Sequence, residues 1–533
     1  MPAAGCPDVW QNGSRPMQRL SGIDAMFLAL DTPTTRGVMG QLLVFDRTGA
    51  PGGASRAAIR GRLLDRIDAI PPLRWRLREH RLRPGAQYWD DDPAFDIDDH
   101  IHDQVLAAPG TEPQLTAEVG RLMSLPLAPH QPLWELHVIE GLEGGRVAHL
   151  FKIHHALIDG GLISTVTAAL ADDSPGTPSP KSPSRAVLPR GRPHALRHSL
   201  ASTLLSPVRF AGLQAEFMAW LGTRTLQDGV WTVPDMVARS LPGALGAPAR
   251  AAVRLRYKLQ ADGRGEVAAA VPSFRPPKTT LNGALTSRRD YAFATAPLAE
   301  VKRIGSVVGV TVNDVVMALC AAAVRRYLGE LGRLPRRPLT AVVAVSTRGG
   351  HERYTWTNHV WMLLTPLPTD VEDPMQRLKA ARAAMQGAKA TYEALPFGLL
   401  QPASFFWPSP LIAAGTRLVA RPAVAGRIPV SPWNLTISNV RGPARPISIT
   451  GARIEGNYPV TFLPPGTGLG IAAVSYVDEL AFGLAACPDL VPGLDRLAGH
   501  LTDALAELSR AVGDAAGNVA QRPPASGDFL SAG

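Results

Sequence analysis

The stretch Ile153-His154-His155-Ala156-Leu157-Ile158-Asp159-Gly160 lies where a strand pattern ends and a helix pattern begins. Residues 146–153 (RVAHLFKI) are rich in branched and aromatic side chains and follow two glycines, which predicts a β-strand. After Asp159-Gly160, the apolar residues Leu162, Val166 and Ala169-Leu170 recur at helical spacing, which predicts a helix that begins at this point. The two histidines are therefore expected at a strand–turn–helix junction.

His154 and His155 are neighbours on extended chain, so their side chains should point to opposite faces. We therefore predict that the two histidines have different roles and that at most one faces a given cavity. A histidine near its ordinary pKa of about 6.5 can accept a proton from a hydroxyl at neutral pH. If that hydroxyl attacks a carbonyl held beside it, the result is acyl transfer without a covalent intermediate on the protein. The pattern alone leaves a second interpretation open, namely two polar residues at a strand end.

Asp159 and Gly160 follow the histidines at the predicted start of the helix. We expect Asp159 to pair with an arginine and to fix the loop that aims His155, rather than to bond to the imidazole ring. We expect Gly160 either to let another backbone segment approach closely or to adopt a positive φ.

The length and composition predict a folded protein of two domains. At 533 residues the chain exceeds one ordinary core, and 45% hydrophobic with 19% charged residues excludes a disordered chain. Lys and Arg outnumber Asp and Glu by 55 to 45, a net charge of +10, which suits anionic partners. The basic residues are scattered rather than interleaved with aromatics, so we expect no nucleic-acid partner.

The cysteines and the N-terminal residues are used to predict the cellular compartment of the protein. Cys6, Cys320 and Cys487 are far apart and form neither a CxxC motif nor a disulfide framework, which favours a reducing compartment. The N-terminus lacks the apolar core of a signal peptide, and no run of about 18 apolar residues predicts a membrane span. We expect a cytoplasmic protein, with peripheral attachment to the inner face of the membrane as an open alternative. No metal site is expected.

Local patterns predict further strands and helices. Strands are expected at residues 38–45, 135–142, 339–346, 359–367, 435–440, 469–476 and 480–485. Helices are expected at residues 58–70, 311–328, 374–392 and 490–512. In the clearest helix, 311–328, Thr311 can cap the first turn and Asp314 suits the positive end of the helix dipole.

Two segments between these elements have an unusual composition. Residues 172–198 are dominated by Pro, Ser and basic residues, which predicts an exposed linker. Residues 199–280 return to helical patterning, with an apolar stripe between residues 213 and 221 that is either core or an interfacial helix on lipid. Residues 397–412 combine prolines with large apolar groups, which fits either buried core or a lipid-facing loop.

Four further motifs accompany the histidines. They are Ser21-Gly22-Ile23-Asp24 within LSGIDAMFL, Pro132-Leu133-Trp134, Asn313-Asp314, and SNVRGP at residues 438–443. Taken singly, each has an ordinary interpretation as a helix cap, a strand entry with a core tryptophan, or a strand exit. Together with HHALIDG they resemble, in order and spacing, the bacterial wax ester synthase/diacylglycerol acyltransferase family. That family is related to CoA-dependent acyltransferases and peptide-synthetase condensation domains.

The resemblance spans roughly residues 18–510 and implies an α/β fold. It implies two chloramphenicol-acetyltransferase-like domains, each a mixed β-sheet with flanking helices, around a central tunnel. The implied domains are an N-terminal acyltransferase domain (18–171), a linker (172–198), a connecting helical segment (199–280), a C-terminal acyltransferase domain (281–512) and a disordered tail (513–533). The sequence contains no GxSxG elbow, P-loop or HExxH motif, so hydrolase and zincin interpretations lack support.

The resemblance also implies an activity and its residues. His155 is implied as the general base that deprotonates an acceptor hydroxyl for attack on an acyl-CoA thioester, with His154 beside it and Asp159 ordering the loop. The implied substrate-binding residues are Pro132, Leu133, Trp134, Gly160, Asn313, Asp314, Asn439, Arg441 and Gly442. No cofactor is implied beyond acyl-CoA, which is a co-substrate.

Three functions remain open at this point. The first is acyl transfer to diacylglycerol or to a long-chain alcohol, with possible attachment to a membrane or lipid droplet. The second is a related acyltransferase with another acceptor or a carrier-protein donor. The third is a non-catalytic protein that binds lipid or acyl-CoA, which the intact HHALIDG motif disfavours.

Overall fold

The structure is a computed structural model that describes residues 18–173, 276–346, 356–393 and 431–520, apart from short gaps at 21, 51, 81–82, 357, 359 and 432. Almost all of the predicted linker and connecting segment, including the apolar stripe at 213–221, lies outside the described residues. The apolar segment 397–412 lies outside them as well.

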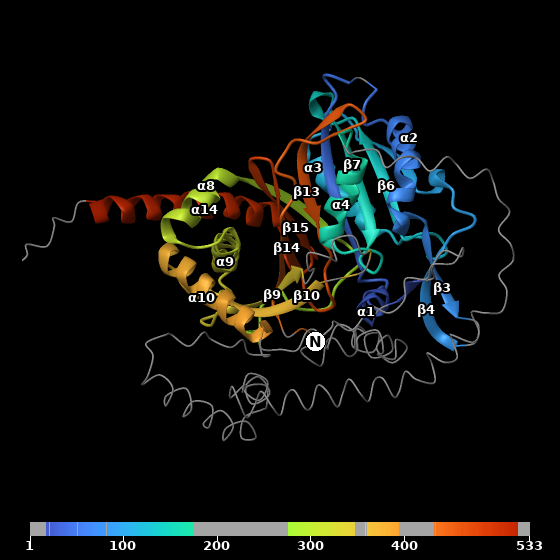
Figure 1. The fold of residues 1–533 in the computed structure, drawn as a ribbon. Coiled ribbons are helices and arrows are strands. Elements are labelled where there is room, and N and C mark those ends of the chain that lie inside the picture. The colour runs from blue at the N-terminus through green and yellow to red at the C-terminus, as the bar shows by residue number, and fades with distance from the viewer. Residues whose placement is uncertain are drawn as a thin grey trace, which may run out of the picture.

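Two six-stranded mixed sheets form the centre of the molecule (Figure 1). The first has the order β12-β13-β2-β7-β6-β5, with β2 (Val38–Asp46), β5 (Ile101–Val105), β6 (Trp134–Glu140), β7 (Val147–His154), β12 (Ser448–Ile449) and β13 (Ala452–Val460). The second has the order β10-β9-β11-β14-β15-β8, with β8 (Asp290–Pro297), β9 (Leu339–Ser346), β10 (Val360–Leu367), β11 (Leu435–Val440), β14 (Leu469–Tyr476) and β15 (Glu479–Ala486). A small third sheet contains β1 (Gln18–Arg19), β4 (Arg83–Asp91) and β3 (Trp75–His80). Parallel pairs join β5 to β6 and β11 to both β9 and β14, so the predicted mixed α/β class is confirmed.

Helices cover each sheet. Around the first half lie α1 (Gly22–Ala29), α2 (Arg56–Arg66), α3 (Glu112–Ser124), α4 (Gly160–Leu170) and the short 3-10 turns Ile67–Ala69, Pro71–Arg74, Ile97–Asp99 and Glu143–Gly145. In the second half, α8 (Leu298–Val308), α9 (Val312–Glu330), α10 (Pro374–Glu393) and α14 (Leu494–Ala520) gather on the left of the view in Figure 1. Within the described ranges no single helix is long and apolar enough to cross a membrane, although α8 and α9, bent by 105°, meet those limits as a pair.

The sheet that carries the histidines takes strands from both halves of the chain. β13 pairs antiparallel with β2, and the buried Gln41 side chain donates a hydrogen bond of 2.8 Å to the Asn457 side chain across that pair. Residues 448–460, which the predicted boundaries place in the second domain, therefore complete the sheet of the first. All eight residues of β7 are buried, because the strand pairs with β2 along one edge and with β6 along the other, and both faces of the sheet are covered there.

Most predicted elements are present with shifts of a few residues at their ends. Thr311 caps α9 through a reciprocal pair of hydrogen bonds with Asp314, as the sequence predicted. The predicted helix at 58–70 is shorter, because α2 ends at Arg66 and a 3-10 turn follows. The last helix begins at Leu494 and continues to Ala520, beyond the predicted start of the tail at residue 513. The elements that the sequence had not predicted include β3, β4, β5, α3, β8, α8 and β13.

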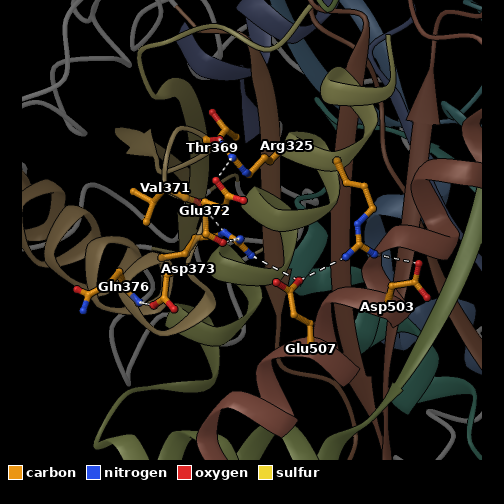
Figure 2. Close-up of polar contacts among 10 residues, drawn as sticks. Arg325, Thr369, Val371, Glu372, Asp373, Gln376, Asp503 and Glu507 are labelled. Carbon is orange, nitrogen blue, oxygen red and sulfur yellow. Dashed lines mark hydrogen bonds and ion pairs between the residues drawn. The ribbon is translucent and has the colours of Figure 1, made fainter. Parts of the chain in front are cut away.

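Arginines hold the helices of the second half together (Figure 2). Arg326 in α9 contacts Asp503 at 3.0 Å and Glu507 at 3.4 Å in α14. Arg377 in α10 is only 5% exposed; it donates to the Val371 carbonyl at 3.0 Å and lies 4.0 Å from Glu507. Glu507 thus links α9 and α10 to α14, and the buried Arg377 has its donors satisfied locally.

The two sheets touch where β15 passes β13, and this contact requires a glycine. A Cβ on Gly483 would lie 1.8 Å from the carbonyl oxygen of Pro459. We expect Gly483→Ala to destabilise the protein by at least about 3 kcal/mol, because backbone must move to relieve the collision. Thermal unfolding of the purified variant measures this.

The matched control is Gly499→Ala in α14, where no described atom lies within 4 Å of the new Cβ. Because alanine favours a helix over glycine by about 0.5–1 kcal/mol, the control should melt at or slightly above the unchanged protein. A Gly483→Ala variant that melted with the control would contradict the close approach of the sheets.

Candidate active site

The histidines sit where β7 ends, as predicted. His154 is the last residue of the strand, opposite Val38 of β2, and its N–H donates to the Leu133 carbonyl at 2.9 Å. His155 is the first residue beyond the strand. Asp159 then caps α4, since its Oδ1 accepts from the Leu162 N–H at 3.1 Å. The predicted strand–turn–helix junction is confirmed.

The His154 ring makes one hydrogen bond and one electrostatic contact. Its Nδ1 accepts a hydrogen bond of 3.1 Å from the Ala156 N–H, so the proton of the neutral ring lies on Nε2. Nε2 faces Asp31 Oδ2 at 3.4 Å, which is an electrostatic contact rather than a full hydrogen bond. Burial opposes a low pKa of Asp31, but His154, the Gly37 N–H and Arg36 together hold that pKa below its usual value. One hydrogen bond and one electrostatic contact therefore orient the His154 ring toward the loop that carries Asp31.

The His155 ring lies in an aromatic environment and makes different contacts. It stacks on Phe27 of α1 with ring centroids 4.1 Å apart and planes 16° apart, and it meets the edge of Phe462 at 5.5 Å. Its Nδ1 is buried and finds no hydrogen-bond partner among the described residues. Burial lowers the pKa of His155 to about 4, against the opposing effect of the negative Asp159. The ring is therefore neutral at pH 7 and can accept a proton.

The backbone of His155 forms hydrogen bonds with residues from both halves of the chain. Its N–H donates to the Gly37 carbonyl at 2.8 Å. Its carbonyl accepts a hydrogen bond of 2.7 Å from Asn358 Nδ2, which also donates to Asp24 Oδ1 of α1 at 2.5 Å. Asn358 lies just before β10, so the second half of the chain fixes the position of the histidine loop.

The loop between α1 and β2, residues 31–37, contacts both histidines. Asp31 Oδ1 accepts from the Gly37 N–H at 2.9 Å, while its other oxygen faces His154. A Cβ on Gly37 would lie 2.8 Å from the Phe27 carbonyl oxygen and 3.0 Å from His154 Nε2. Only glycine fits here without moving the α1 backbone or the His154 ring.

A buried ion pair lies on the same sheet face as His154. Lys152 is 0% exposed and donates to Glu135 at 3.0 Å, and the same carboxylate oxygen contacts His137 Nε2 at 3.1 Å. Burial would raise the pKa of Glu135, but His137 and Lys152 lower it to about 2. Glu135 and His137 also line an open groove of about 540 Å³ against β5, β6 and α3, and His155 is not among its lining residues.

The Pro132-Leu133-Trp134 motif supports the histidine strand. Trp134 is 1% exposed, donates from Nε1 to the Leu73 carbonyl at 2.8 Å, and stacks on His100 at 4.5 Å. The Leu133 carbonyl accepts from the His154 N–H, as described above. These contacts give the motif a structural role, and substrate binding by its residues stays a prediction.

The structure brings two other motifs together. Asn439 Nδ2 donates to Asn313 Oδ1 at 3.3 Å, which joins the end of β11 to the start of α9. Gly442 passes so close to β14 that a Cβ would lie 2.0 Å from the Ser475 carbonyl oxygen, while Arg441 is exposed. No described contact links this group to His155, so substrate binding by Asn313, Asp314, Asn439, Arg441 and Gly442 stays a prediction.

The two reasons predicted for Gly160 are wrong. Gly160 is the first residue of α4, its φ is not positive, and no described atom lies within 4 Å of the place of a Cβ. The glycine of this site that packs closely against neighbouring atoms is Gly37, which directly precedes β2. The expected pairing of Asp159 with an arginine stays a prediction, and its place at the N-terminus of α4 agrees with the helix start predicted at Asp159-Gly160.

Comparison with known proteins shows to which family the chain belongs. Residues 20–316 match the family model described as the wax ester synthase/diacylglycerol acyltransferase catalytic domain, and residues 356–509 match the WS/DGAT C-terminal domain. The chain belongs to the wax ester synthase/diacylglycerol acyltransferase family. The predicted resemblance is therefore confirmed.

Relatives and solved structures agree with this family. A Mycobacterium tuberculosis protein named "probable diacylglycerol O-acyltransferase" is 34% identical over 498 residues, which cover 92% of this chain and 98% of the relative. A second relative from that organism, also named for diacylglycerol O-acyltransferase activity, is 32% identical over 494 residues, covering 92% of this chain and 90% of its own. The solved wax ester synthase/diacylglycerol acyltransferase of Marinobacter aquaeolei VT8 aligns with TM-score 0.60 and 26% identity, covering 93% of this chain and all of that one. The first condensation domain of the calcium-dependent antibiotic synthetase, at TM-score 0.54 and 16% identity over 96% of this chain and all of that one, shares the fold.

The Asn358 bridge can be tested with an isosteric change. Asn358→Asp replaces the donor that serves Asp24 and the His155 carbonyl with an oxygen acceptor. Because this places two carboxylates together in a buried site, we expect a loss of stability of about 3 kcal/mol or more. We also expect a fall in activity as the histidine loop loosens.

Asn313→Asp is the stability control, since the Asn313 oxygen accepts from Asn439 and a carboxylate keeps that acceptor near the positive start of α9. Thermal unfolding should show a small change for the control and a large one for Asn358→Asp. Equal melting temperatures for the two variants would contradict the bridge.

Proposed function

We propose that this protein transfers a long-chain fatty acyl group from acyl-CoA to the hydroxyl of diacylglycerol, of a long-chain alcohol, or of both, with His155 as general base. The names of the relatives support the reaction class. The observation that carries the proposal is the contrast between the two histidines. His154 accepts a hydrogen bond at Nδ1 and its Nε2 faces the Asp31 carboxylate at 3.4 Å, whereas His155 is a neutral, buried imidazole that packs between aromatic rings and whose Nδ1 has no hydrogen-bond partner among the described residues.

The reaction needs one proton carrier. His155 takes the proton of the acceptor hydroxyl as its oxygen attacks the thioester carbonyl, which gives a tetrahedral intermediate. The carbon–sulfur bond then breaks, the ester leaves with the acceptor oxygen, and the imidazolium returns the proton to the CoA thiolate. The products are the ester and CoA, and the ring ends as it began, so no further cofactor is required.

Two physical effects would accelerate the proposed acyl transfer. Holding donor and acceptor in line is worth roughly 7–11 kcal/mol in favourable cases, and general-base help adds about 10²–10⁴-fold. A pKa of about 4 makes His155 a weaker base than free imidazole, but it keeps the ring unprotonated at every pH near neutrality. The negative oxygen that develops on the intermediate would favour the imidazolium once substrates are bound.

The substrates suggest where the protein works. Long acyl chains need an apolar tunnel, and each buried CH₂ stabilises the complex by about 0.8 kcal/mol. The net charge of +10 would favour peripheral binding to an acidic lipid surface on the cytoplasmic side, at a membrane or a lipid droplet.

The first test is His155→Ala. Purified protein is given palmitoyl-CoA with either diacylglycerol or hexadecanol, and the CoA thiol released is measured over time. We expect the variant to lose at least about 10²-fold in rate with either acceptor, since it lacks the base.

His130→Ala is the matched control, because His130 is an exposed histidine of the same half. The control should release CoA at the original rate, and the preferred acceptor should be evident from the parallel assays. Unchanged rates in His155→Ala would refute the proposed base.

The pH dependence gives a second test. Because burial lowers the pKa of His155 to about 4, the base form persists well below the ordinary value of 6.5. We expect kcat/KM to stay level from pH 7 down to about pH 5 and to fall only as the pH approaches 4.

The same shift affects stability. An unfolded chain with a histidine pKa near 6.5 binds more protons than the folded protein, so stability decreases as the pH falls from 6.5 to 4. Brief assays started from protein stored at pH 7 separate the two effects. An acid limb in kcat/KM centred at 6.5 would contradict the buried, neutral base.

A further inference from the structure

Arg36 is a partly buried cation near the end of the 31–37 loop, which contacts both histidines. Its Nε is buried, and no hydrogen bond or ion pair joins its guanidinium to the described residues. A buried charge is costly unless it is paired, and arginine usually finds a carboxylate, a carbonyl or a phosphate. An unpaired guanidinium beside a candidate catalytic site therefore suggests that a ligand supplies the partner.

The place of Arg36 in the chain fixes its relation to the site. It directly precedes Gly37, whose carbonyl accepts from the His155 N–H. Arg36 lies two residues before Val38, which pairs with His154. Residues two apart on extended backbone share a face, so Arg36 falls on the face of the sheet that carries His154 and Lys152. Burial raises the pKa of Asp31, and the charge of Arg36 helps to lower it, after the stronger effects of His154 and the Gly37 N–H.

A second arginine stands nearby and also lacks an acidic partner among the described residues. Arg289 donates from Nη1 to the Thr286 and Arg288 carbonyls and from Nη2 to the Thr34 carbonyl of the 31–37 loop. Burial lowers the pKa of Arg289, and the charge of Arg36 lowers it further. The two guanidiniums are therefore close enough to repel each other.

The two carboxylates nearest to the arginines already have other partners. Lys152 is neutralised by Glu135, and Asp31 directs its oxygens to His154 and the Gly37 N–H. Neither Arg36 nor Arg289 forms an ion pair with a carboxylate of the described residues. A phosphate is the anion whose oxygens match the planar fork of a guanidinium.

We propose that Arg36, reinforced by the charge of Arg289, binds a phosphate group of the acyl-CoA donor. This proposal rests on the proposed function, since it identifies where the anionic end of that donor is held. The pantetheine arm would span the distance from this phosphate to the thioester beside His155. The contact adds binding energy remote from the reacting carbonyl, so it should act on KM rather than on kcat.

The test compares donors with and without phosphate. KM and kcat are measured for palmitoyl-CoA and for palmitoyl-pantetheine in the unchanged protein, Arg36→Ala, Arg36→Gln and Arg36→Lys. We expect KM for palmitoyl-CoA to rise about 10–100-fold in the first two variants, with kcat little changed and partial recovery in Arg36→Lys. KM for palmitoyl-pantetheine should be the same in all four proteins.

Arg47→Ala is the matched control, because Arg47 follows the opposite end of β2 and pairs with Glu140 at 3.4 Å. It should leave both KM values unchanged. Arg36 variants in which KM rises equally for both donors would show a structural role of the loop and overturn the proposal. Variants that lose affinity for acidic phospholipid vesicles but keep KM for palmitoyl-CoA would assign the site to a lipid headgroup instead.

Calorimetric titration with adenosine 3′,5′-bisphosphate and with CoA separates this proposal from the proposed function. Weaker binding of either ligand by Arg36→Gln than by the unchanged protein supports the phosphate site, even if no acyl transfer is detected. Equal binding of both ligands by the two proteins overturns it, even if acyl transfer by His155 is established.

Discussion

The hydrogen bond from the His155 N–H to the Gly37 carbonyl is the contact on which the site depends. It continues the ladder between β7 and β2 one residue past the Val38–His154 pair, at the point where the chain leaves the sheet for α4. Gly37 can make this contact because no side chain separates it from the Phe27 backbone and the His154 ring. One glycine thus sets the distance between the α1–β2 loop and the histidines.

The division of labour between the two histidines follows from that geometry. The ladder turns the Nε2 of His154 toward Asp31, while its Nδ1 accepts from the Ala156 N–H, and leaves His155 between Phe27 and Phe462. Burial in this aromatic environment removes the proton that free imidazole would partly carry at neutral pH, so a base is available without an acidic partner on the ring. Phe462 and Asn358 come from the second half, which means that neither half alone completes the site.

Sequence patterns predicted the parts of this site whose signals are local. The β7–α4 junction and the capped helix α9 each lie within about 20 residues, and both are present as expected. The pairing of β13 with β2 and the contact of Asn358 with His155 join residues 203 or more positions apart, and no periodicity reports such pairs. Gly160 was misjudged because the residue type alone does not tell which glycine of a site lies against backbone. Asp31 and Gly37 sit in an ordinary turn sequence, so only the fold shows that they face His154.

The central claim is that His154 is fixed as one tautomer while His155 is a free, neutral imidazole, and nitrogen-15 NMR of labelled histidine rings tests it most directly. Spectra recorded from pH 7.5 to pH 4.5, with the two residues assigned by single substitutions, report the protonation of each ring nitrogen. The account predicts that the neutral His154 ring at pH 7.5 has an unprotonated Nδ1 and a protonated Nε2, and that His155 stays neutral until the pH approaches about 4. A His155 ring that titrates near pH 6.5, or a His154 ring protonated at Nδ1 at neutral pH, would contradict it.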